Sequence, residues 1–275
     1  MKKFAILFVA LIVGVTSYSQ RKPKIKGNKN VIEVREDLEP FYGIELADDL
    51  DIVIQKASHE GYALELDDNL VDVLKFKVDN GVLKISSFYN ITSKRKLEIT
   101  IFFQELNSIK MLNGKISMKD VISTDKLRVQ TFGTSRLELN ATADIIDVSM
   151  EEISSGDFNL ASDSLNIVLK DRIDVKLYTT GESNNIYMYK NASAKVEGTS
   201  DFLMAKLYGN SALKASNLQS NDVLVIAEDS PDVEVRALNT IQLSSKGATR
   251  TKLYGDAEIT ILDFLDTSRL EKEKN

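Results

Sequence analysis

The chain has 275 residues, a formal net charge of −6 and a pI of about 5.1, and it contains no cysteine and no tryptophan. The absence of cysteine excludes disulfides, thiol catalysis, cysteine metal sites and a lipidated bacterial lipoprotein N-terminus. The acidic balance argues against general nucleic-acid binding, which is usually associated with a basic face and a high pI.

The N-terminus has the pattern of a secretory signal peptide. Two lysines at positions 2 and 3 precede an apolar run from Phe4 to Val15, which ends at the small residues Ser17 and Ser19. This run is shorter than the roughly 20 residues that span a bilayer, so we favour a signal peptide over residues 1–19 against the alternative of a membrane anchor. Cleavage after Ser19 leaves 256 residues (275 minus 19). We therefore expect an exported protein that is periplasmic, outer-membrane-associated or extracellular.

The mature chain begins with a basic segment, residues 20–30, which we expect to be a flexible leader. Residues 31–104 then alternate apolar and polar positions in longer runs. Asn80-Gly81 lies between two such runs and predicts a β-hairpin, because both residues accept positive φ. Residues 67–74 are compatible with one or two helical turns. These features predict a more irregular, mostly β N-terminal half.

A repeat of about 19 residues occupies residues 105–262. Each unit has two brief alternating apolar runs with a polar turn between them. The first runs begin at residues 116, 137, 158, 175, 194, 213, 233 and 251, which are 21, 21, 17, 19, 19, 20 and 18 residues apart. The second runs follow in step, beginning at residues 127, 146, 165, 186, 203, 223, 241 and 259. Residues 263–275 are expected to form a polar C-terminal tail.

The repeat predicts a parallel β-helix, also called a β-solenoid. Strands of three to five residues are too short for a broad sheet, but each can pair with its copy in the next coil, about 4.8 Å away. A β-sandwich is the competing fold, because its turns have similar spacing. The shared register of two runs over eight units favours the solenoid. We predict that the apolar positions form interior columns; one contains Leu139, Leu160, Leu177, Val196, Ala215, Val235 and Leu253, and the other contains Val129, Val148, Ile167, Met188, Ala205, Val225, Leu243 and Ile261.

The sequence resembles a known family across about residues 31–262. The segments that carry the resemblance are Phe41 to Ile44, Leu50 to Gln55, Asn80 to Ile85, Ile101 to Ile116 and Lys252 to Asp256. They are similar to the family described as putative auto-transporter adhesins with a head GIN domain, secreted proteins common in Bacteroidetes. The resemblance implies a β-helical fold, with right-handed coils, and an adhesive role, and it supplies no catalytic residues. The family usually has a proline where this chain has Gln104, and Ser-Gly-Ser-Gly-like turns from which residues 151–155, 170–173 and 228–232 depart.

Motifs for catalysis or cofactor binding are absent from the sequence. His59 is the one histidine, and a single histidine without cysteine cannot build a His-rich metal site or a recognisable catalytic triad. No phosphate-binding glycine loop or calcium-binding glycine repeat is present. We therefore assign no catalytic, cofactor-binding or metal-binding residues.

Other β-helices include polysaccharide lyases and hydrolases, which work with clustered carboxylates. Two acidic pairs are candidates here, Asp157 with Asp174 and Asp229 with Asp232. A polysaccharide-active enzyme that uses surface carboxylates is therefore the alternative to a binding module.

The outward positions of the first runs predict a stripe of lysines. They read Ser117, Glu138, Asn159, Lys176, Lys195, Lys214, Glu234 and Lys252. Lys176, Lys195 and Lys214 would lie on successive coils about 4.8 Å apart, where like charges repel unless they are solvated or neutralised. The stripe is either a solvated surface that protects the sheet from aggregation or a binding site for an anionic glycan.

The outward positions of the second runs predict an apolar patch of Tyr187, Met204 and Leu224. Such patches often mark protein interfaces, and self-association is one outcome. The alternative is that the C-terminal tail folds over the patch through Phe264 and Leu265.

Together these patterns predict an all-β, single-chain, right-handed parallel β-helix with a more irregular N-terminal half. We interpret it as a non-enzymatic secreted or cell-surface binding or structural module of adhesin-like character. The expected partners are a surface glycan, a protein or a second copy, with no nucleic acid, no cofactor and no transmembrane segment after removal of the signal peptide.

Overall fold

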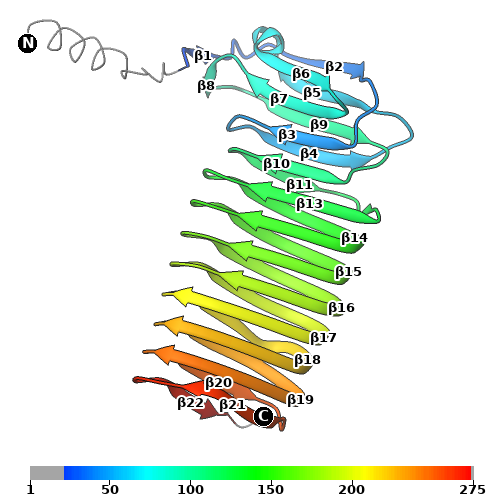
Figure 1. Ribbon diagram of the computed structural model, residues 1–275. Coiled ribbons are helices and arrows are strands. Elements are labelled where there is room, and N and C mark those ends of the chain that lie inside the picture. Colours follow the sequence, from blue (N-terminus) through cyan, green and yellow to red (C-terminus); the bar gives the residue numbers. More distant parts are fainter. Residues whose placement is uncertain (1–21, 274–275) are drawn as a thin grey trace, which may run out of the picture.

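Residues 22–273, which this computed structural model describes, wind into a β-solenoid of about 9 coils spaced about 19 residues apart (Figure 1). Successive coils stack along one axis, so that nearly every strand pairs in parallel with the equivalent strand of the next coil. The parallel β-solenoid predicted from the repeat is confirmed. The predicted signal peptide, residues 1–19, lies outside the described residues.

The N-terminal half has shorter strands and mixed pairing. Its elements are β1 (Lys24–Lys26), β2 (Val31–Asp37), β3 (Gly43–Leu46), β4 (Asp51–Lys56), β5 (Gly61–Asp67), the 3₁₀ helix η1 (Asp68–Val73), β6 (Leu74–Asp79), β7 (Val82–Ser87), β8 (Asn90–Ser93), β9 (Leu97–Phe103), β10 (Ser108–Met111), β11 (Lys115–Met118), β12 (Ile122–Ser123) and β13 (Lys126–Thr131). β2 pairs antiparallel with β5, β5 with β9, and β6 with β7. The expected hairpin is present between β6 and β7, with φ of 50° at Asn80 and 73° at Gly81, and η1 supplies the expected helical turns.

The C-terminal half consists of long strands that each cross from one face of the solenoid to the other. They are β14 (Arg136–Met150), β15 (Ser155–Leu169), β16 (Asp174–Met188), β17 (Ser193–Gly209), β18 (Ala212–Asp229) and β19 (Asp232–Gly247), followed by β20 (Arg250–Tyr254), β21 (Glu258–Phe264) and β22 (Arg269–Lys272). The N-terminal parts of β14–β19, with β20 and β22, form what we call the first face. The C-terminal parts of β14–β19, with β13 and β21, form the second face.

The interior of the solenoid is an apolar column on each face, as the repeat predicts. Leu139, Leu177 and Val196 are buried in the first face, and Val148 and Ala205 in the second. Two positions differ from the predicted columns. Leu139 pairs with Phe158, not with Leu160, and Ile167 pairs with Ile186, not with Met188, although both displaced residues are themselves buried.

A turn with positive φ recurs at the same place in eight successive coils. The residues concerned are Gly133, Glu152, Asp171, Lys190, Gly209, Asp229, Gly247 and Asp266, with φ between 60° and 95°. Carboxylates of one coil support this turn in the coil before it, because Glu152, Asp229 and Asp266 accept hydrogen bonds from the backbone N–H of Gly133, Gly209 and Gly247 at 2.8, 3.2 and 3.0 Å. These bonds compensate part of the strain that a side chain meets at positive φ.

Strands lie beyond both boundaries that the sequence predicts for the solenoid, in a separate two-stranded sheet at the N-terminal end and in the solenoid sheet at the C-terminal end. At the N-terminal end, β1 lies within the expected leader and pairs with β8. At the C-terminal end, β21 continues to Phe264 and β22 pairs with β20. The segment expected as a polar tail therefore adds strands to the stack and does not fold back over the second face.

Candidate functional site

The first face carries the lysine stripe expected from the sequence. Lys176 of β16 pairs in register with Lys195 of β17, which pairs with Lys214 of β18, and all three side chains are exposed. The strand alternation that buries Leu177 and Val196 points these lysines outward. The register places Asp157 before Lys176 in this row, where the sequence predicted Asn159. Three amines thus project from three consecutive strands of one sheet.

Only one of the three stripe lysines has an ion-pair partner among the described residues. Lys195 Nζ lies 2.6 Å from a carboxylate oxygen of Glu197, two residues further along the same strand. The Lys195 ammonium and the Asn217 amide lower the pKa of Glu197. Lys176 and Lys214 on either side have no acid within ion-pair distance in the described part of the chain. Two of the three stripe amines therefore lack an ion-pair partner among the described residues, and Asp157 and Glu234 bound the row on the neighbouring strands.

An exposed aromatic ring lies beside the stripe. Tyr178 follows Lys176 by two residues on the same side of β16, and 52% of it is exposed. Together with Asn159, Lys176 and Lys195, it lines a shallow hollow of about 400 Å³. Sequence reasoning missed Tyr178, although its position two residues after Lys176 in an alternating strand was a usable signal. The hollow offers a ligand an apolar ring face, an amide, two amines and the carboxylates of Asp157 and Glu197.

The first acidic pair lies next to this hollow. Asp157 and Asp174 both line a neighbouring hollow of about 260 Å³ with Lys115, Arg136 and Lys176. They are not register partners, because Asp157 pairs with Lys176 and Asp174 with Ser155. Basic side chains and a third acid, Glu138, thus line the hollow beside both carboxylates.

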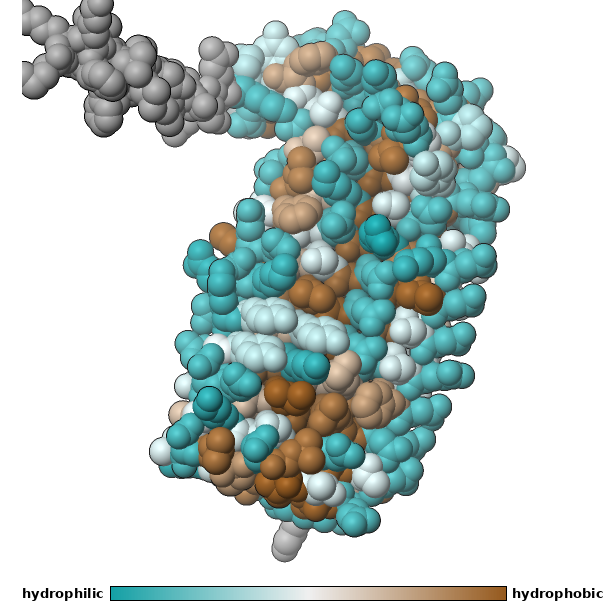
Figure 2. Space-filling view, in the orientation of Figure 1, coloured by the Kyte–Doolittle hydropathy of each residue, from teal (hydrophilic) through white to brown (hydrophobic). Residues whose placement is uncertain are grey.

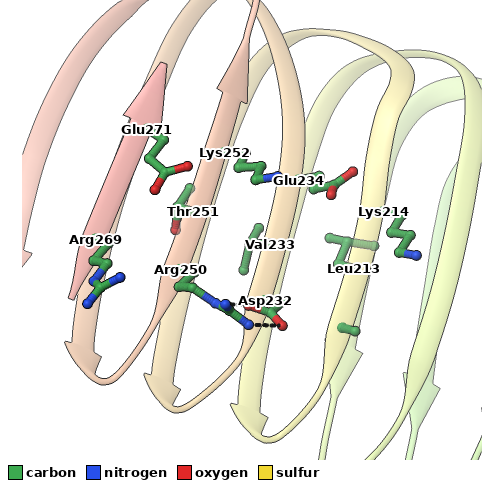
Figure 3. A pocket seen from close by; sticks show the side chains of 11 residues that line it. Leu213, Lys214, Asp232, Val233, Glu234, Arg250, Thr251, Lys252, Arg269 and Glu271 are labelled. Carbon is green, nitrogen blue, oxygen red and sulfur yellow. Dashed lines mark hydrogen bonds and ion pairs between the residues drawn. The ribbon is translucent and has the colours of Figure 1, made fainter. Parts of the chain in front are cut away.

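The second acidic pair is divided between two structural roles. Asp229 occupies the positive-φ turn and accepts the hydrogen bond from Gly209. Asp232 forms a bidentate ion pair with Arg250, at 2.6 and 2.8 Å (Figure 3). Each carboxylate is therefore engaged by a partner within the fold.

Charges alternate in the last rows of the first face. Figure 3 shows Lys214, Glu234, Lys252 and Glu271 in one row on successive strands, at a hollow of about 590 Å³. The positive stripe therefore ends at Lys214, and the strands beyond it present mixed charge.

The second face carries a band of hydrophobic residues. The C-terminal parts of β14–β19, which form this face, run across the front of the molecule to their arrowheads at the left in Figure 1, and Figure 2 shows hydrophobic residues gathered in a band along the same side. Within the expected patch, Met204 and Leu224 are register partners and half-buried. Tyr187 is also half-buried, but it pairs with Lys206, whose amine lies 5.6 Å from the centre of the Tyr187 ring. The register therefore places Tyr187 in the adjacent row, where the sequence placed it in the row of Met204.

Two further ladders accompany this band. Asn185 donates a hydrogen bond to Asn166, which donates one to Asp147, each at 3.0 Å and each to the coil before. The rings of Tyr189 and Tyr208, which lie one coil apart, stack with their centres 5.2 Å apart. The second face is thus an ordered surface of amides and aromatic rings.

Residues 22–273 contain no group of three or more His, Cys, Asp or Glu side chains placed to hold a metal ion. His59 is exposed, and its ring contacts Ser58 at 3.2 Å and Asp37 at 3.8 Å. In the same part of the chain, no helix is both long and apolar enough to cross a membrane.

The stacked coils define the chain as a parallel β-solenoid, with a lysine stripe on its first face and ladders of amides and aromatic rings on its second face. Residues 40–161 and 151–257 both match the family described as "Putative auto-transporter adhesin, head GIN domain". The chain belongs to this family, as the resemblance of its sequence predicted. No curated protein shows significant similarity to it.

Solved structures share the fold at low sequence identity. A crystal structure described as a putative adhesin from Parabacteroides distasonis ATCC 8503 is 13% identical, with a TM-score of 0.66 over 91% of this chain and 100% of that chain. One described as a putative adhesin from Parabacteroides merdae ATCC 43184 is 11% identical, with a TM-score of 0.61 over 91% and 99%. One described as a putative lipid binding protein from Parabacteroides distasonis ATCC 8503 is 17% identical, with a TM-score of 0.60 over 91% and 99%. At identities of 11–17%, the structural similarity shows that these proteins share the fold of this chain, and it shows nothing beyond the fold.

Proposed function

We propose that this protein is a non-enzymatic, exported binding module that holds an acidic polysaccharide along its first face. The observation that carries the proposal is the register of Lys176, Lys195 and Lys214 on three consecutive strands. Like charges that stack in register destabilise a sheet unless they are neutralised. A polyanion with regularly spaced charges therefore gains the most binding free energy where the amines are already aligned to meet those charges.

Tyr178 supplies the second component of the site. An exposed aromatic ring in a strand presents an apolar face at little cost in conformational entropy, and sugar rings have apolar faces of matching size. The Asn159 amide, which lines the same hollow, offers donors and an acceptor to sugar hydroxyls. The combination of amines, amide and ring favours an acidic sugar polymer over a simple anion.

The comparisons support a binding role in coarser terms. The family is described as "Putative auto-transporter adhesin, head GIN domain", and two of the three solved structures named above are described as putative adhesins. The signal-peptide pattern of residues 1–19 fits a protein that meets such polymers outside the cytoplasm.

The proposal is tested with the mature chain, residues 20–275, by measuring equilibrium binding to a sulfated polysaccharide (heparin), a carboxylated one (alginate) and a neutral one (dextran). The variant Lys176→Glu/Lys195→Glu/Lys214→Glu is compared with the matched control Lys56→Glu/Lys77→Glu/Lys119→Glu, whose lysines are exposed elsewhere. Both variants make the net charge more negative by the same six units, because each of the three substitutions removes one positive charge and adds one negative charge.

We expect binding to at least one acidic polymer and none to dextran. The stripe variant should lose at least about tenfold in affinity, because three exposed ion pairs of roughly 0.5–1 kcal/mol each exceed the 1.4 kcal/mol that corresponds to tenfold. Tyr178→Ala should weaken binding without altering the fold. Equal losses in the stripe variant and the control would remove the proposal.

The alternative function is cleavage of the polysaccharide by surface carboxylates. A glycosidase of this kind needs a carboxyl group whose pKa is raised so that it can donate a proton. Among the described residues every shifted carboxyl pKa is lowered, and the acids at Asp229 and Asp232 are held by structural partners. Chain length of the bound polymer, followed by size-exclusion chromatography over a day, separates the two functions, since only an enzyme shortens it.

We further propose that the patch of Tyr187, Met204 and Leu224 contacts a protein partner. All three are half-buried apolar or aromatic side chains on a sheet face with no covering layer among the described residues. The test is capture of envelope proteins by the wild type and by Leu224→Lys, with cross-linked partners identified by mass. Partners retained equally by the variant would refute a role for the patch.

A further inference from the structure

The last coil of the solenoid is uncovered. β21 pairs only with β19 and β22 only with β20, so the outer edge of each strand has no strand partner among the described residues. Ile259 and Ile261 occupy the same inward positions as the buried Ile241 and Leu243, yet 38% and 45% of them are exposed. Phe264, in the row of the buried Ser245, is 42% exposed. Figure 2 shows hydrophobic residues gathered at this end of the molecule.

The opposite end of the solenoid is closed. η1 lies over the first coils and buries Leu70 and Val73, and the antiparallel strand β2 forms a charged outer layer with Glu33 and Arg35. Natural sheets protect their edges in this way, whereas an exposed apolar edge pairs readily with another chain. Because the C-terminal end is the open one within residues 22–273, a head-to-tail stack of copies would bring an open edge against a covered one.

We propose that the C-terminal coil is the interface of a two-fold symmetric dimer, in which β21 and β22 each pair antiparallel with the same strand of a second copy. A two-fold axis perpendicular to the solenoid axis reverses the strand direction, so the new pairs must be antiparallel. This arrangement covers Ile259, Ile261 and Phe264 and gives the unpaired backbone groups of both edges a partner.

The sequence of β22 is complementary to itself. When the two-fold axis passes through Leu270, this half-buried side chain meets its own copy, and the outward Arg269 lies opposite Glu271 of the second copy. Arg269 also lies next to Arg250 in register, and Arg250 is already paired with Asp232. Arg269 has no acid within ion-pair distance in the described part of the chain, so the second copy provides the opposite charge that its own row lacks.

The mass of the mature chain in solution tests the dimer. We expect sedimentation velocity to show a dimer whose population rises with protein concentration. The concentrations run from about 1 to about 100 μM, which is roughly the range of dissociation constants of moderate interfaces. Ile261→Lys/Phe264→Lys should shift the protein to monomer with unchanged circular dichroism, because both side chains are already partly exposed. Leu224→Lys, on the second-face patch, is the matched control and should leave the dimer intact.

A single engineered cysteine tests the register independently of stability, because the chain has no cysteine of its own. Leu270→Cys should form a disulfide-linked dimer on mild oxidation, since opposed residues in antiparallel strands lie within the Cα separation that a disulfide spans. Val121→Cys, exposed at a distant turn, should remain monomeric under the same treatment. A monomeric wild type over the whole range, a dimer lost in Leu224→Lys but kept in Ile261→Lys/Phe264→Lys, or equal cross-linking of both cysteine variants would each overturn the proposal.

Discussion

A buried carboxylate joins three segments of the N-terminal end. Asp67 has no exposed surface, and its carboxylate accepts hydrogen bonds from the backbone N–H groups of Lys29, Arg95 and Lys96 at 3.0, 3.1 and 3.2 Å. A side chain at Gly27 would place its Cβ 1.9 Å from Asp67 Oδ2, which explains glycine at that position. Burial raises the pKa of Asp67, but the backbone donors lower it by more, so the net shift is downward.

The lowered pKa of Asp67 predicts acid sensitivity at the N-terminal end. A carboxyl group whose pKa is lower in the folded state stabilises the fold above its unfolded pKa, about 3.9, and this contribution is lost as the pH falls through the folded pKa. Asp67→Asn should lower the melting temperature at neutral pH, and the difference from wild type should shrink below about pH 4. The exposed Asp72→Asn is the control. A difference that is constant down to low pH would contradict this role.

One glycine is required by a close approach between coils. Gly198 has φ of 119°, and a Cβ there would lie 1.9 Å from the carbonyl oxygen of Thr179 in the coil before. We predict that Gly198→Ala lowers the free energy of unfolding by more than about 1 kcal/mol. Alanine is strained at this positive φ, and its Cβ would also collide with the Thr179 carbonyl oxygen. Thr199→Ala, at the next exposed position, should have little effect on urea unfolding. Equal stability of the two variants would show that the backbone relaxes at this corner.

At the scale of single strands, the amide ladder of the second face links three coils. Asn166 in β15 donates to Asp147 in β14 and accepts from Asn185 in β16. Burial raises the pKa of Asp147, while hydrogen bonds from Lys126 and Asn166 lower it by more. The ladder therefore couples the stability of a strand pair to the charge on one carboxylate.

We predict that Asn166→Leu lowers the free energy of unfolding by about 1 kcal/mol, because it removes two half-buried hydrogen bonds and leaves their partners unsatisfied. The same substitution should raise the pKa of Asp147, measured by NMR titration. Asn159→Leu on the exposed first face is the matched control, and an unchanged Asp147 titration in Asn166→Leu would contradict the ladder.

The strands of the repeat show which features the sequence pattern predicts and why it misplaces two registers. Alternation located the apolar runs of the repeat, but it predicted two strands of three to five residues per coil where β14–β19 are single strands of 15–18 residues, and two registers were displaced. Gly156 occupies an inward position, and the Phe158 ring fills the space its missing side chain leaves, with a Cβ there 2.3 Å from the ring. In β16 the buried Asn184 stands at another inward position and contacts Thr179 Oγ1 at 3.4 Å. Because Gly156 and Asn184 occupy inward positions, the apolar pattern is interrupted there. An alignment of the apolar runs alone therefore selects residues two positions too far along each strand.

The sequence pattern indicates where a coil turns, but it does not indicate which residue of the turn adopts positive φ. Asn191 and Ser230 are of residue types that favour turns, whereas the positive φ values fall on the residues before them, Lys190 and Asp229. Residue preferences alone would not choose lysine for that conformation. The coil before and the coil after fix it, through backbone hydrogen bonds such as Asn191 N to Asp171 O at 3.1 Å, which no single-coil pattern contains.

At the scale of the whole molecule, the two ends of the solenoid differ, and this was not apparent from the repeat. The repeat treats each coil alike, but β2, β5 and η1 close the N-terminal end while β21 and β22 leave the C-terminal end open. The proposed dimer would join the first faces of two copies into one longer surface. Both lysine stripes would then face the same side, so an immobilised polymer that reaches both would bind with higher avidity than either stripe alone.

The central claim is that the stripe of Lys176, Lys195 and Lys214 is the place where an acidic polymer binds. Lysine acetylation footprinting of the wild-type mature chain, with and without heparin or alginate, measures this at every lysine in one experiment. We predict strong protection of Lys176, Lys195 and Lys214 and unchanged labelling of Lys56 and Lys77. Uniform protection, or protection centred on lysines away from the first face, would contradict the account.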